Sequence, residues 1–394
     1  MKYDVVVVGA GPVGSTAAGL LAEKGYSVIL LEEHHTIGKP MQCGGLVSPR
    51  IKELVDFSIP VTNRVKGAFI HEPEGDVFCI MAEETKGLVI DRTEFDRRAA
   101  KWAVRKGVML SISSPVKSIE ITESGVRLSI LGDEMSDKKL EAEFVMGADG
   151  PYSITAKAGR LPGFKEIISG FEIEAIGAVR DLKMVEVFTG EKVGGGFFAW
   201  VIPVRKDRLR IGSGVHNSPH SALTSLSNLF SIYPDRFKDI QPLSFHGGAI
   251  PIGMREYIYF RRGLVMGDAA GLAKPISGGG IITGLKSATI AAEVVSKALK
   301  RGDTKKNALS DYQKRVNSEM GKELKRAWHL RRAFMHMQDN ELKVLFQMLS
   351  KPKVKELINR KGDIDYPGRL AIELMRASPG LLRYAFRYIG KNLW

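Results

Sequence analysis

A run of β-branched residues followed by three spaced glycines constrains the fold of this chain more than any other feature. Asp4-Val5-Val6-Val7-Val8 is too short for a helix, and its unbroken apolar run is typical of a strand buried on both faces of a parallel sheet. Gly9, Gly11 and Gly14 follow with the spacing Gly-x-Gly-x-x-Gly. The first glycine allows a tight turn, the second lets a pyrophosphate approach the backbone, and the third lets a helix pack closely on the strand.

The residues after this turn complete the pattern of a dinucleotide-binding unit. We expect a helix at residues 15–24, whose N-terminal N–H groups and dipole face the phosphates. Gly25 ends this helix, Val28–Leu31 forms the second strand, and Glu32 lies where a carboxylate would bind the hydroxyls of a ribose. Because strand, turn, helix, strand and acid occur in this order, the sequence predicts a dinucleotide site.

Two other interpretations of this segment fit its residues less well. Val5–Ala22 carries no charge and is long enough to suggest a transmembrane helix, but three glycines and Pro12 interrupt it. A signal peptide would require a small-residue cleavage site, and none follows. We therefore expect no targeting segment and a cytoplasmic protein.

Composition indicates a globular protein of two or three domains. The chain has 394 residues, of which 44% are hydrophobic and 26% are charged. Two cysteines, Cys43 and Cys79, exclude a disulfide scaffold, and the histidines lack the spacing of metal ligands. We expect no metal site.

The formal net charge of +14 attracts polyanions, which include nucleic acids, anionic lipid surfaces and phosphorylated substrates. No helix-turn-helix, zinc finger or RNP pattern accompanies this charge, so we expect no nucleic-acid partner. A basic surface that is merely solvated would explain the same charge.

A loop dense in glycine and proline, residues 37–46, follows the nucleotide-binding pattern. Its glycines let the backbone lie against a flat ligand, and Cys43 stands at its centre, where we expect contact with a cofactor or substrate. A buried structural cysteine is the common alternative. Arg92, near the start of a helix expected at Phe95–Lys106, could hold a diphosphate or could be an ordinary surface arginine.

The rest of the chain alternates between strand-rich and helical segments. A hairpin is expected at Val65–Met81, turning around residues 72–75. Residues 171–214 read as a twisted antiparallel sheet laid over something flat. Further strands are expected at Val126–Leu131 and Phe144–Gly147, and helices at Thr155–Gly159, Ser221–Tyr233, Ile281–Lys300 and from Asp311 to the end.

Two later turns repeat the Gly/Asp pattern of the first. Together, Gly9-Ala-Gly11-Pro-Val-Gly14, Gly147-Ala-Asp149-Gly150 and Gly267-Asp268-Ala-Ala-Gly271 resemble the three FAD fingerprints of the p-hydroxybenzoate-hydroxylase-like flavoproteins. The resemblance covers residues 1–301. It implies an α/β fold with a discontinuous Rossmann-type FAD-binding domain (1–64, 88–165 and 248–302), an antiparallel-sheet substrate domain (65–87 and 166–247) and a helical C-terminal region (303–394).

This resemblance also implies roles for individual residues. Glu32 would bind the adenosine ribose, Arg92 would lie along the diphosphate, and Asp268 would accept a hydrogen bond from a ribitol hydroxyl. The N-terminus of the helix from Ile281 would face the N1/O2 edge of the flavin, where helix N–H groups stabilise the negative charge of the reduced ring. The cofactor-binding residues expected on this basis are Gly9, Gly11, Pro12, Val13, Gly14, Glu32, Glu33, Cys43, Gly44, Gly45, Arg92, Val116, Asp149, Gly267, Asp268, Gly279, Gly280 and Ile281.

Two shorter motifs narrow the resemblance. Pro40-x-x-Cys43-Gly44-Gly45 and Phe198-Ala-Trp200-Val-Ile-Pro203 resemble geranylgeranyl reductases, and more specifically the archaeal digeranylgeranylglycerophospholipid reductases, which saturate the isoprenoid chains of membrane lipids. Ile202 replaces the phenylalanine of that family and brings the run near the Trp-x-Trp-x-Ile-Pro of flavin halogenases. The first glycine turn lacks the Gly-Gly-x-Gly-Thr-x-Gly form of halogenases, so the reductases remain the better match.

The reductase resemblance implies transfer of a hydride from flavin N5 and of a proton to an isolated alkene. The candidate proton donors are a water, a tyrosine or Cys43. Trp200 and Phe198 would line an apolar tunnel, although ordinary core packing would also explain Phe198. The chain has one Gly-x-Gly-x-x-Gly and no arginine placed for a 2′-phosphate, so electrons would come from a transient donor, either ferredoxin or a diffusing reduced cofactor.

Three further possibilities remain open at this point. An FAD-dependent monooxygenase acting on aromatic compounds or quinones would have the same fold, and a flavin redox carrier or lipid-binding module would show no turnover.

The segment Leu381–Ile389, with Lys391 and Trp394, suits an interfacial helix on an anionic membrane and a prenylated lipid substrate. A terminal helix packed on its own domain fits this segment equally well.

Overall fold

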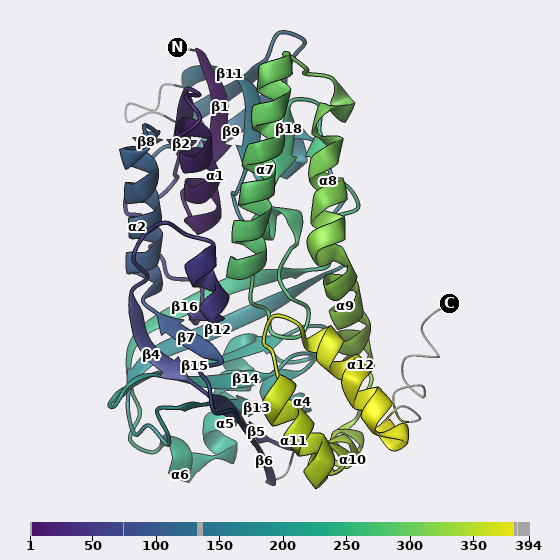
Figure 1. The fold of residues 1–394 in the computed structure, drawn as a ribbon. Helices are drawn as coiled ribbons and strands as arrows, with labels where there is room; N and C mark the ends of the chain where they lie inside the picture. The colour runs from purple at the N-terminus through teal and green to yellow at the C-terminus, as the bar shows by residue number, and fades with distance from the viewer. Residues whose placement is uncertain (1, 74, 132–136, 382–383, 385–394) are drawn as a thin grey trace.

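A mixed sheet, parallel at its centre, lies at one end of the molecule and carries the N-terminal strand (Figure 1). The computed structural model describes residues 2–73, 75–131, 137–381 and 384 (Figure 1). The first sheet has eight strands and the order β17-β18-β11-β1-β2-β8, with β10 and β9 extending from β11. Its strands are β1 Lys2–Val8, β2 Val28–Leu31, β8 Met109–Ser111, β9 Val116–Ile121, β10 Val126–Leu131, β11 Asp137–Gly147, β17 Tyr259–Phe260 and β18 Gly263–Val265.

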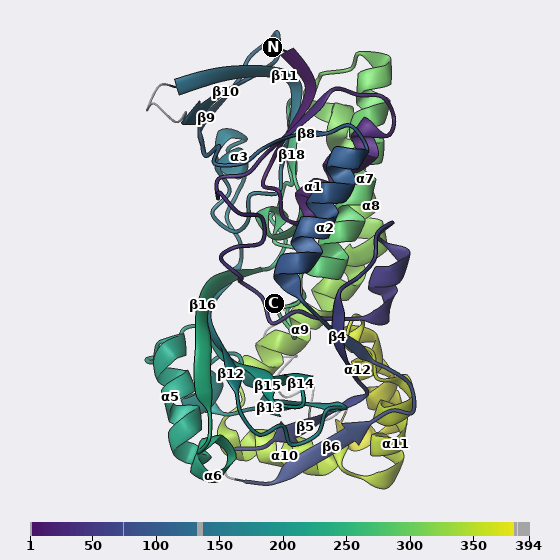
Figure 2. The same ribbon diagram turned by 90° about the vertical axis from the view of Figure 1, so that its left-hand side faces the viewer.

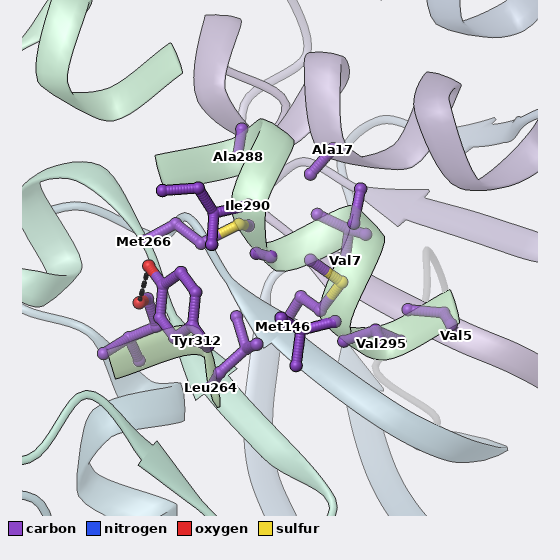
Figure 3. Close-up of a cluster of buried hydrophobic side chains, with 14 of the residues drawn as sticks. Val5, Val7, Ala17, Met146, Leu264, Met266, Ala288, Ile290, Val295 and Tyr312 are labelled. Carbon is purple, nitrogen blue, oxygen red and sulfur yellow. Dashed lines mark hydrogen bonds between the residues drawn. The ribbon is translucent and has the colours of Figure 1, made fainter. Parts of the chain in front are cut away.

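Strand β1 lies between β11 and β2 and is parallel to both. Val5 and Val7 point to one face, where they join a core with α1 (Pro12–Ala22), α7 (Ile281–Arg301) and α8 (Ser310–Val316). Figure 3 shows Val7, Met146 and Leu264 of the sheet in this core, with Leu264 beside Tyr312, whose hydroxyl donates to the carbonyl oxygen of Val265 at 2.9 Å. Val6 and Val8 point to the other face, into a core with β9 and β10. Burial of both faces explains the unbroken apolar run, as the sequence predicted.

The helices begin where local capping groups allow. Helix α1 starts at Pro12, three residues earlier than expected, because Gly11 is its N-cap and proline fits the first helical position. Helix α2 (Arg92–Arg105) also starts early, because the Asp91 side chain caps it by accepting from the backbone N–H of Glu94 at 2.9 Å. The helices expected at Thr155–Gly159, Ser221–Tyr233 and Ile281–Lys300 are α3 (Ile154–Ala158), α5 (Ala222–Ile232) and α7.

A second sheet of seven strands lies below the first in Figure 1. Its order is β16-β12-β15-β14-β13-β5-β6, and its bounds are β5 Gly67–His71, β6 Val77–Met81, β12 Glu166–Ile176, β13 Met184–Phe188, β14 Ala199–Arg205, β15 Arg208–Val215 and β16 Gln241–Ile252. The expected hairpin is the pair β5–β6. Neighbouring strands are antiparallel except β13 and β5, which are parallel. Helices α5 and α6 (Pro234–Phe237) cover one face, and α4 (Glu191–Gly194) follows β13.

Short elements and a helical region connect the two sheets. A small sheet is formed by β3 Leu46–Val47, β7 Gly87–Ile90 and β4 Val61–Val65, and a 3₁₀ turn at Pro49–Glu53 follows β3.

The division into three domains by residue range stays a prediction, and strand β16 runs through its expected boundary at residue 248. A short π-helical segment, Asn317–Gly321, joins α8 to α9.

The C-terminal helices close the far edge of the second sheet (Figure 2). They are α9 Lys322–Met335, α10 Asp339–Leu349, α11 Pro352–Lys361 and α12 Pro367–Ala377. Phe78 of β6 packs against Phe346 of α10 and Leu374 of α12. Of the segment expected to meet a membrane, only Leu381 and Tyr384 belong to the described residues. Across the described ranges no helix combines the length and apolarity needed to cross a membrane.

A buried ion pair fastens this helical region to the glycine-rich loop before α7. Lys274 Nζ donates to Asp365 Oδ1 at 2.7 Å and to the carbonyl oxygen of Ile364 at 3.0 Å. Arg50 adds a bond to Asp365 Oδ2 at 3.1 Å. Burial alone would raise the pKa of Asp365, but the charge of Lys274 and the hydrogen bonds from Lys274, Ser48 and Arg50 together outweigh it and hold that pKa below its usual range. The carboxylate is therefore charged and paired.

We predict that Asp365→Asn lowers the free energy of unfolding by about 3 kcal/mol near neutral pH, because Lys274 is left buried without its counterion. Since the pKa of Asp365 is depressed by folding, this difference should shrink as the pH falls through the range where the carboxylate takes up a proton. Chemical denaturation at several pH values measures it. Glu373→Gln, which breaks the exposed pair with Lys361, is the matched control and should change stability by less than about 1 kcal/mol.

Candidate functional site

A cavity of about 900 Å³ opens where the carboxyl ends of the parallel strands meet the second sheet and the C-terminal helices. Ligand sites in parallel α/β sheets lie at this edge. The cavity brings together residues that the sequence places far apart. Thirteen of the predicted site residues line it: Gly11, Pro12, Val13, Cys43, Gly44, Gly45, Arg92, Phe198, Trp200, Asp268, Gly279, Gly280 and Ile281.

Two helix N-termini reach the cavity wall. Helix α1 begins after Gly11 and helix α7 after Gly280, and neither has a side-chain hydrogen bond at its N-cap within the described chain. Their first residues, Pro12, Val13 and Ile281, line the cavity. Unpaired N–H groups and the positive end of the helix dipole favour negatively charged ligand atoms at both places.

The glycines of the first turn have different physical roles. A Cβ on Gly9 would overlap the backbone carbonyl of Ala148, and a Cβ on Gly14 would overlap the carbonyl oxygen of Gly9. These two glycines therefore allow the turn, the helix and strand β11 to approach one another. A Cβ on Gly11, in contrast, would meet no protein atom within 4 Å. Gly11 leaves open space in the cavity wall, at the position where a pyrophosphate would approach the backbone.

Asp268 offers a carboxylate to the same cavity. It follows β18, beside Gly280, and is only partly buried. In the described part of the chain its carboxylate receives no side-chain hydrogen bond, and desolvation raises its pKa while the charge of Arg92 opposes that shift. A hydroxyl donor from a bound ligand would satisfy this acceptor. Asp268 therefore fits the ribitol contact predicted from the sequence.

Arg92 and Cys43 lie next to each other at the cavity. Arg92 is held by Asp96, with both carboxylate oxygens 3.1 Å from Nη2, and it also interacts with the Cys43 thiol. Burial alone would lower the pKa of Arg92, but Asp96 and Cys43 together outweigh that effect and raise it. The Cys43 sulfur accepts a long bond from the Gly45 N–H at 3.4 Å. The guanidinium is thus a fixed positive charge in the wall.

The remaining predicted cofactor residues lie behind the wall or away from it: Gly9, Gly14, Glu32, Glu33, Val116, Asp149 and Gly267 do not line the cavity. Glu32 is close, because its Oε2 accepts from the Ala10 N–H at 2.9 Å. The Glu33 side chain is 68% exposed, and Val116 packs on the core under β9 and β10. Their contacts with a cofactor stay predictions.

Asp149 has a local role that its motif did not reveal. Its carboxylate accepts from Ser153 Oγ at 2.6 Å, and from the N–H and Oγ1 of Thr155 at 2.9 and 3.0 Å. These bonds hold the turn that leads into α3. The neighbours Ala148, Gly150 and Pro151 line the cavity in its place.

Aromatic side chains, among them Phe198 and Trp200, form one wall of the cavity. The Phe198 ring stacks on Phe197 with centroids 4.1 Å apart and meets Trp200 edge-on at 5.9 Å. Beyond them, apolar residues of β5, β6 and the C-terminal helices continue the lining, among them Ile70, Phe78, Leu345, Phe346 and Leu374. The helices after residue 335 were missed as part of the site, because their apolar residues are also typical of ordinary core packing.

Sequence reasoning also missed Glu172, a buried acid in the cavity wall. Glu172 is 5% exposed, and its Oε2 accepts a hydrogen bond from the Trp200 indole at 2.7 Å. Burial raises the pKa of Glu172 to about 6, although the indole bond and the charge of Arg210 oppose the shift. Two acids in the otherwise apolar strand Phe171-Glu-Ile-Glu-Ala-Ile176 were the available signal.

The comparison with known families agrees with the cofactor cradle, which is formed by Gly11, the N-termini of α1 and α7 and the Asp268 carboxylate. Residues 2–324 match the family model of an FAD binding domain. The chain belongs to this family of flavoproteins. FAD is its cofactor, and the open space at Gly11, the two uncapped helix N-termini and the Asp268 carboxylate fit that molecule.

Curated relatives narrow the family further. A digeranylgeranylglycerophospholipid reductase of Methanocaldococcus jannaschii is 31% identical, and the match covers 91% of this chain and 95% of the relative. A second reductase with this name, from Methanothermobacter thermautotrophicus, is 32% identical over 89% of this chain and 92% of its own length. The chain belongs to the same family as these reductases.

Solved structures show the same fold. A geranylgeranyl bacteriochlorophyll reductase-like protein of Thermoplasma acidophilum is 25% identical and matches with a TM-score of 0.82 over 96% of this chain and 99% of its own. A flavin-dependent brominase matches with a TM-score of 0.72 at 17% identity, over 97% of this chain and all of its own. The brominase shows a shared fold only, so the reductases remain the better-supported comparison.

We predict that Gly11→Ala and Gly14→Ala separate cofactor binding from folding. Gly11→Ala should fold normally, because the φ angle of Gly11 is −64°, a value that suits alanine. It should bind FAD about tenfold more weakly or worse, because the added methyl group enters the cavity. Gly14→Ala should lose about 1–3 kcal/mol of stability through overlap with Gly9. Flavin fluorescence titration and thermal unfolding measure the two effects. If Gly11→Ala bound FAD with wild-type affinity, the placement of Gly11 at the FAD site would be wrong.

We also predict a pH-dependent stability difference at Glu172. Because folding raises its pKa from 4.5 to about 6, the folded protein binds more protons than the unfolded chain between these values. Stability contributed by the protonated acid is therefore lost as the pH rises through about 6. The free energy of unfolding of Glu172→Gln, relative to that of the wild type, should rise by about 2 kcal/mol as the pH increases from about 4 to about 7. Denaturation curves at both pH values test this, and a constant difference would refute it.

Proposed function

We propose that the protein is an FAD-dependent reductase that saturates isoprenoid double bonds of archaeal-type membrane lipids or their precursors. The observation that carries this proposal is the continuity of one cavity. One end is lined by the glycines and helix N-termini of the FAD cradle, and the other by apolar residues of the second sheet and the C-terminal helices. The relatives named as digeranylgeranylglycerophospholipid reductases support the same substrate class.

Each part of the cradle would hold a different part of FAD. The N-terminus of α1 with Gly11 would hold the diphosphate, Asp268 would accept from a ribitol hydroxyl, and the N-terminus of α7 would stabilise negative charge at the N1/O2 edge. Gly44 and Gly45 would allow the Cys43 loop to lie against the flat ring. When bound and reduced, FAD supplies a hydride at N5.

The aromatic wall and the apolar compartment would hold the substrate. An isolated trisubstituted alkene has no electron-withdrawing group, so positive charge develops on its tertiary carbon as a proton is added. The ring faces of Phe198 and Trp200 would stabilise that charge. Cys43, beside Arg92 at the cradle, would contact the cofactor or the reacting part of the substrate. The C-terminal helices would exclude water from the prenyl chain.

The proposal extends to partners and location. Electrons would come from a transient donor, ferredoxin or a diffusing reduced cofactor, because the sequence has one dinucleotide-binding motif. A cytoplasmic protein that touches the membrane surface would reach a lipid substrate, and the net charge of +14 favours an anionic surface. We propose no nucleic-acid partner.

The test of this function is a lipid assay on the purified protein. The protein is loaded with FAD, reduced chemically without oxygen, and mixed with a digeranylgeranylglyceryl phospholipid in detergent. Mass spectrometry should detect a ladder of products, each heavier than the last by two hydrogen atoms. Gly11→Ala, which should fold but bind FAD poorly, is the matched control. Products that gain an oxygen atom in air would favour the monooxygenase alternative, and an unchanged lipid with reduced, bound FAD would contradict the reductase.

A further inference from the structure

A row of side chains crosses the cavity face of the second sheet at one register. His246 of β16 is paired with Glu172 of β12, Glu172 with Gly212 of β15, and Gly212 with Trp200 of β14. Because paired residues point to the same face of a sheet, this row presents one acid, one imidazole and one indole together. His246, Glu172 and Trp200 all line the cavity.

Gly212, the one member of this row without a side chain, determines how the others are arranged. A Cβ on Gly212 would overlap the Trp200 indole, so the indole lies across the glycine and reaches the strand beyond it. There its Nε1–H donates to Glu172 Oε2 at 2.7 Å. The position without a side chain is therefore what brings Trp200 and Glu172 into contact, although they are separated by an intervening strand.

The second oxygen of Glu172 is buried without a partner. Oε1 has no hydrogen bond among the described residues, while the residue as a whole is 5% exposed. A carboxylate with one orphaned oxygen is a poorly stabilised anion, whereas a carboxylic acid can place its proton on that oxygen. The indole bond fixes Oε2 as the acceptor, so the unpartnered Oε1 is the oxygen that can carry the proton.

The charges around Glu172 do not supply it with a direct counterion. On its own strand, Glu174 opposes ionisation, and on β15 the Arg210 guanidinium favours it. Arg210 is committed elsewhere, because it donates to Glu174, to the Gly44 carbonyl oxygen at 2.8 Å and to the Ile90 carbonyl oxygen at 3.1 Å.

The groups on the other neighbouring elements do not change this balance. On β16, burial lowers the pKa of His246, which favours its neutral form. Arg92 of α2, together with Cys43 in the adjoining loop, faces the cradle, and the Arg92 guanidinium is paired with Asp96. Burial therefore dominates and raises the pKa of Glu172 to about 6, within reach of a proton donor near neutral pH.

We propose that Glu172 is the general acid of this site and donates the Oε1 proton to one carbon of a prenyl double bond. This inference rests on the proposed reductase function. In the step, the O–H bond of Glu172 breaks as a C–H bond forms at one alkene carbon, and FAD, when bound and reduced, would supply the hydride for the other carbon. The alkene would thus gain two hydrogens and two electrons, with reduced FAD as the two-electron donor. The Glu172 carboxylate then regains a proton from water.

The other donors that the sequence suggested are less well placed. Within the described chain, Tyr384 is the tyrosine that lines the cavity, and its hydroxyl donates to the Glu341 carbonyl oxygen at 2.6 Å. Cys43 lies beside the Arg92 guanidinium, and its sulfur already accepts from the Gly45 N–H at 3.4 Å. Glu172 combines burial, a fixed second oxygen and an unpartnered first oxygen.

The decisive experiment compares Glu172→Gln with the wild type and with Glu120→Gln, the same change at an exposed position of β9. Each protein is loaded with FAD, reduced without oxygen and mixed with the prenyl phospholipid, and both flavin reoxidation and product are followed. We expect Glu172→Gln to bind FAD normally but to saturate the lipid about 100-fold more slowly or worse. Glu172→Asp should restore part of the rate, and Glu120→Gln should match the wild type.

Two readouts separate proton donation from a structural effect. Without substrate, infrared spectra should contain a carboxylic acid band that disappears as the pH rises through about 6 and is absent in Glu172→Gln. In turnover, the rate should fall above about pH 6. Because the indole bond favours ionisation of Glu172, Trp200→Phe should move this fall to higher pH, whatever it does to the maximal rate.

The outcomes distinguish this inference from the function on which it rests. Wild-type protein that saturates no prenyl lipid overturns the reductase, and the proton-donor role falls with it. A wild-type protein that is active, beside a Glu172→Gln variant of equal rate and equal pH profile, overturns the role of Glu172 alone. Loss of the pH-dependent step in Cys43→Ser, and not in Glu172→Gln, would assign the proton to the cysteine instead.

Discussion

The whole structure depends on close backbone contacts at the carboxyl edge of the parallel sheet. Gly9 lies against the carbonyl of Ala148, Gly14 lies against Gly9, and Gly267 and Gly284 pack around the side chain of Val13. These contacts join β1, β11, the turn after β18 and helix α7, which lie far apart in the sequence, into one wall. A side chain at the tightest of them would separate the helix from its strand. The cradle for FAD is therefore a consequence of close packing as much as of hydrogen bonding.

The second sheet uses the alternation of its strands to build both a core and a reaction chamber. Ile173 and Val201 point into the core under α5, whereas Glu172 and Trp200 point into the cavity. A buried acid on such a face is costly unless it is protonated or paired, and here a single indole donor meets one oxygen and nothing meets the other in the described chain. The sheet thus sets a buried acid and an indole side by side in the cavity wall.

The C-terminal helices connect substrate enclosure to the cofactor loop. They complete the apolar end of the cavity through contacts with Phe78, and they are fastened to the loop before α7 by the buried pair of Lys274 and Asp365. The same loop leads into the helix N-terminus that faces the cavity. The ion pair therefore links the helices at the apolar end of the cavity to the loop that precedes the N-terminus of α7.

The sequence alone determined the elements whose signals lie close together along the chain. These are the buried strand before Gly9, the three Gly/Asp turns, the β5–β6 hairpin and the long helix from Ile281, because strand periodicity and glycine turns depend on neighbouring residues. Only the tertiary structure decided that Asp149 holds its own turn, that the C-terminal helices line the cavity, and that Trp200 reaches Glu172 across Gly212. Such contacts depend on which strands become neighbours and on where a side chain is missing between them, and no local pattern carries that information.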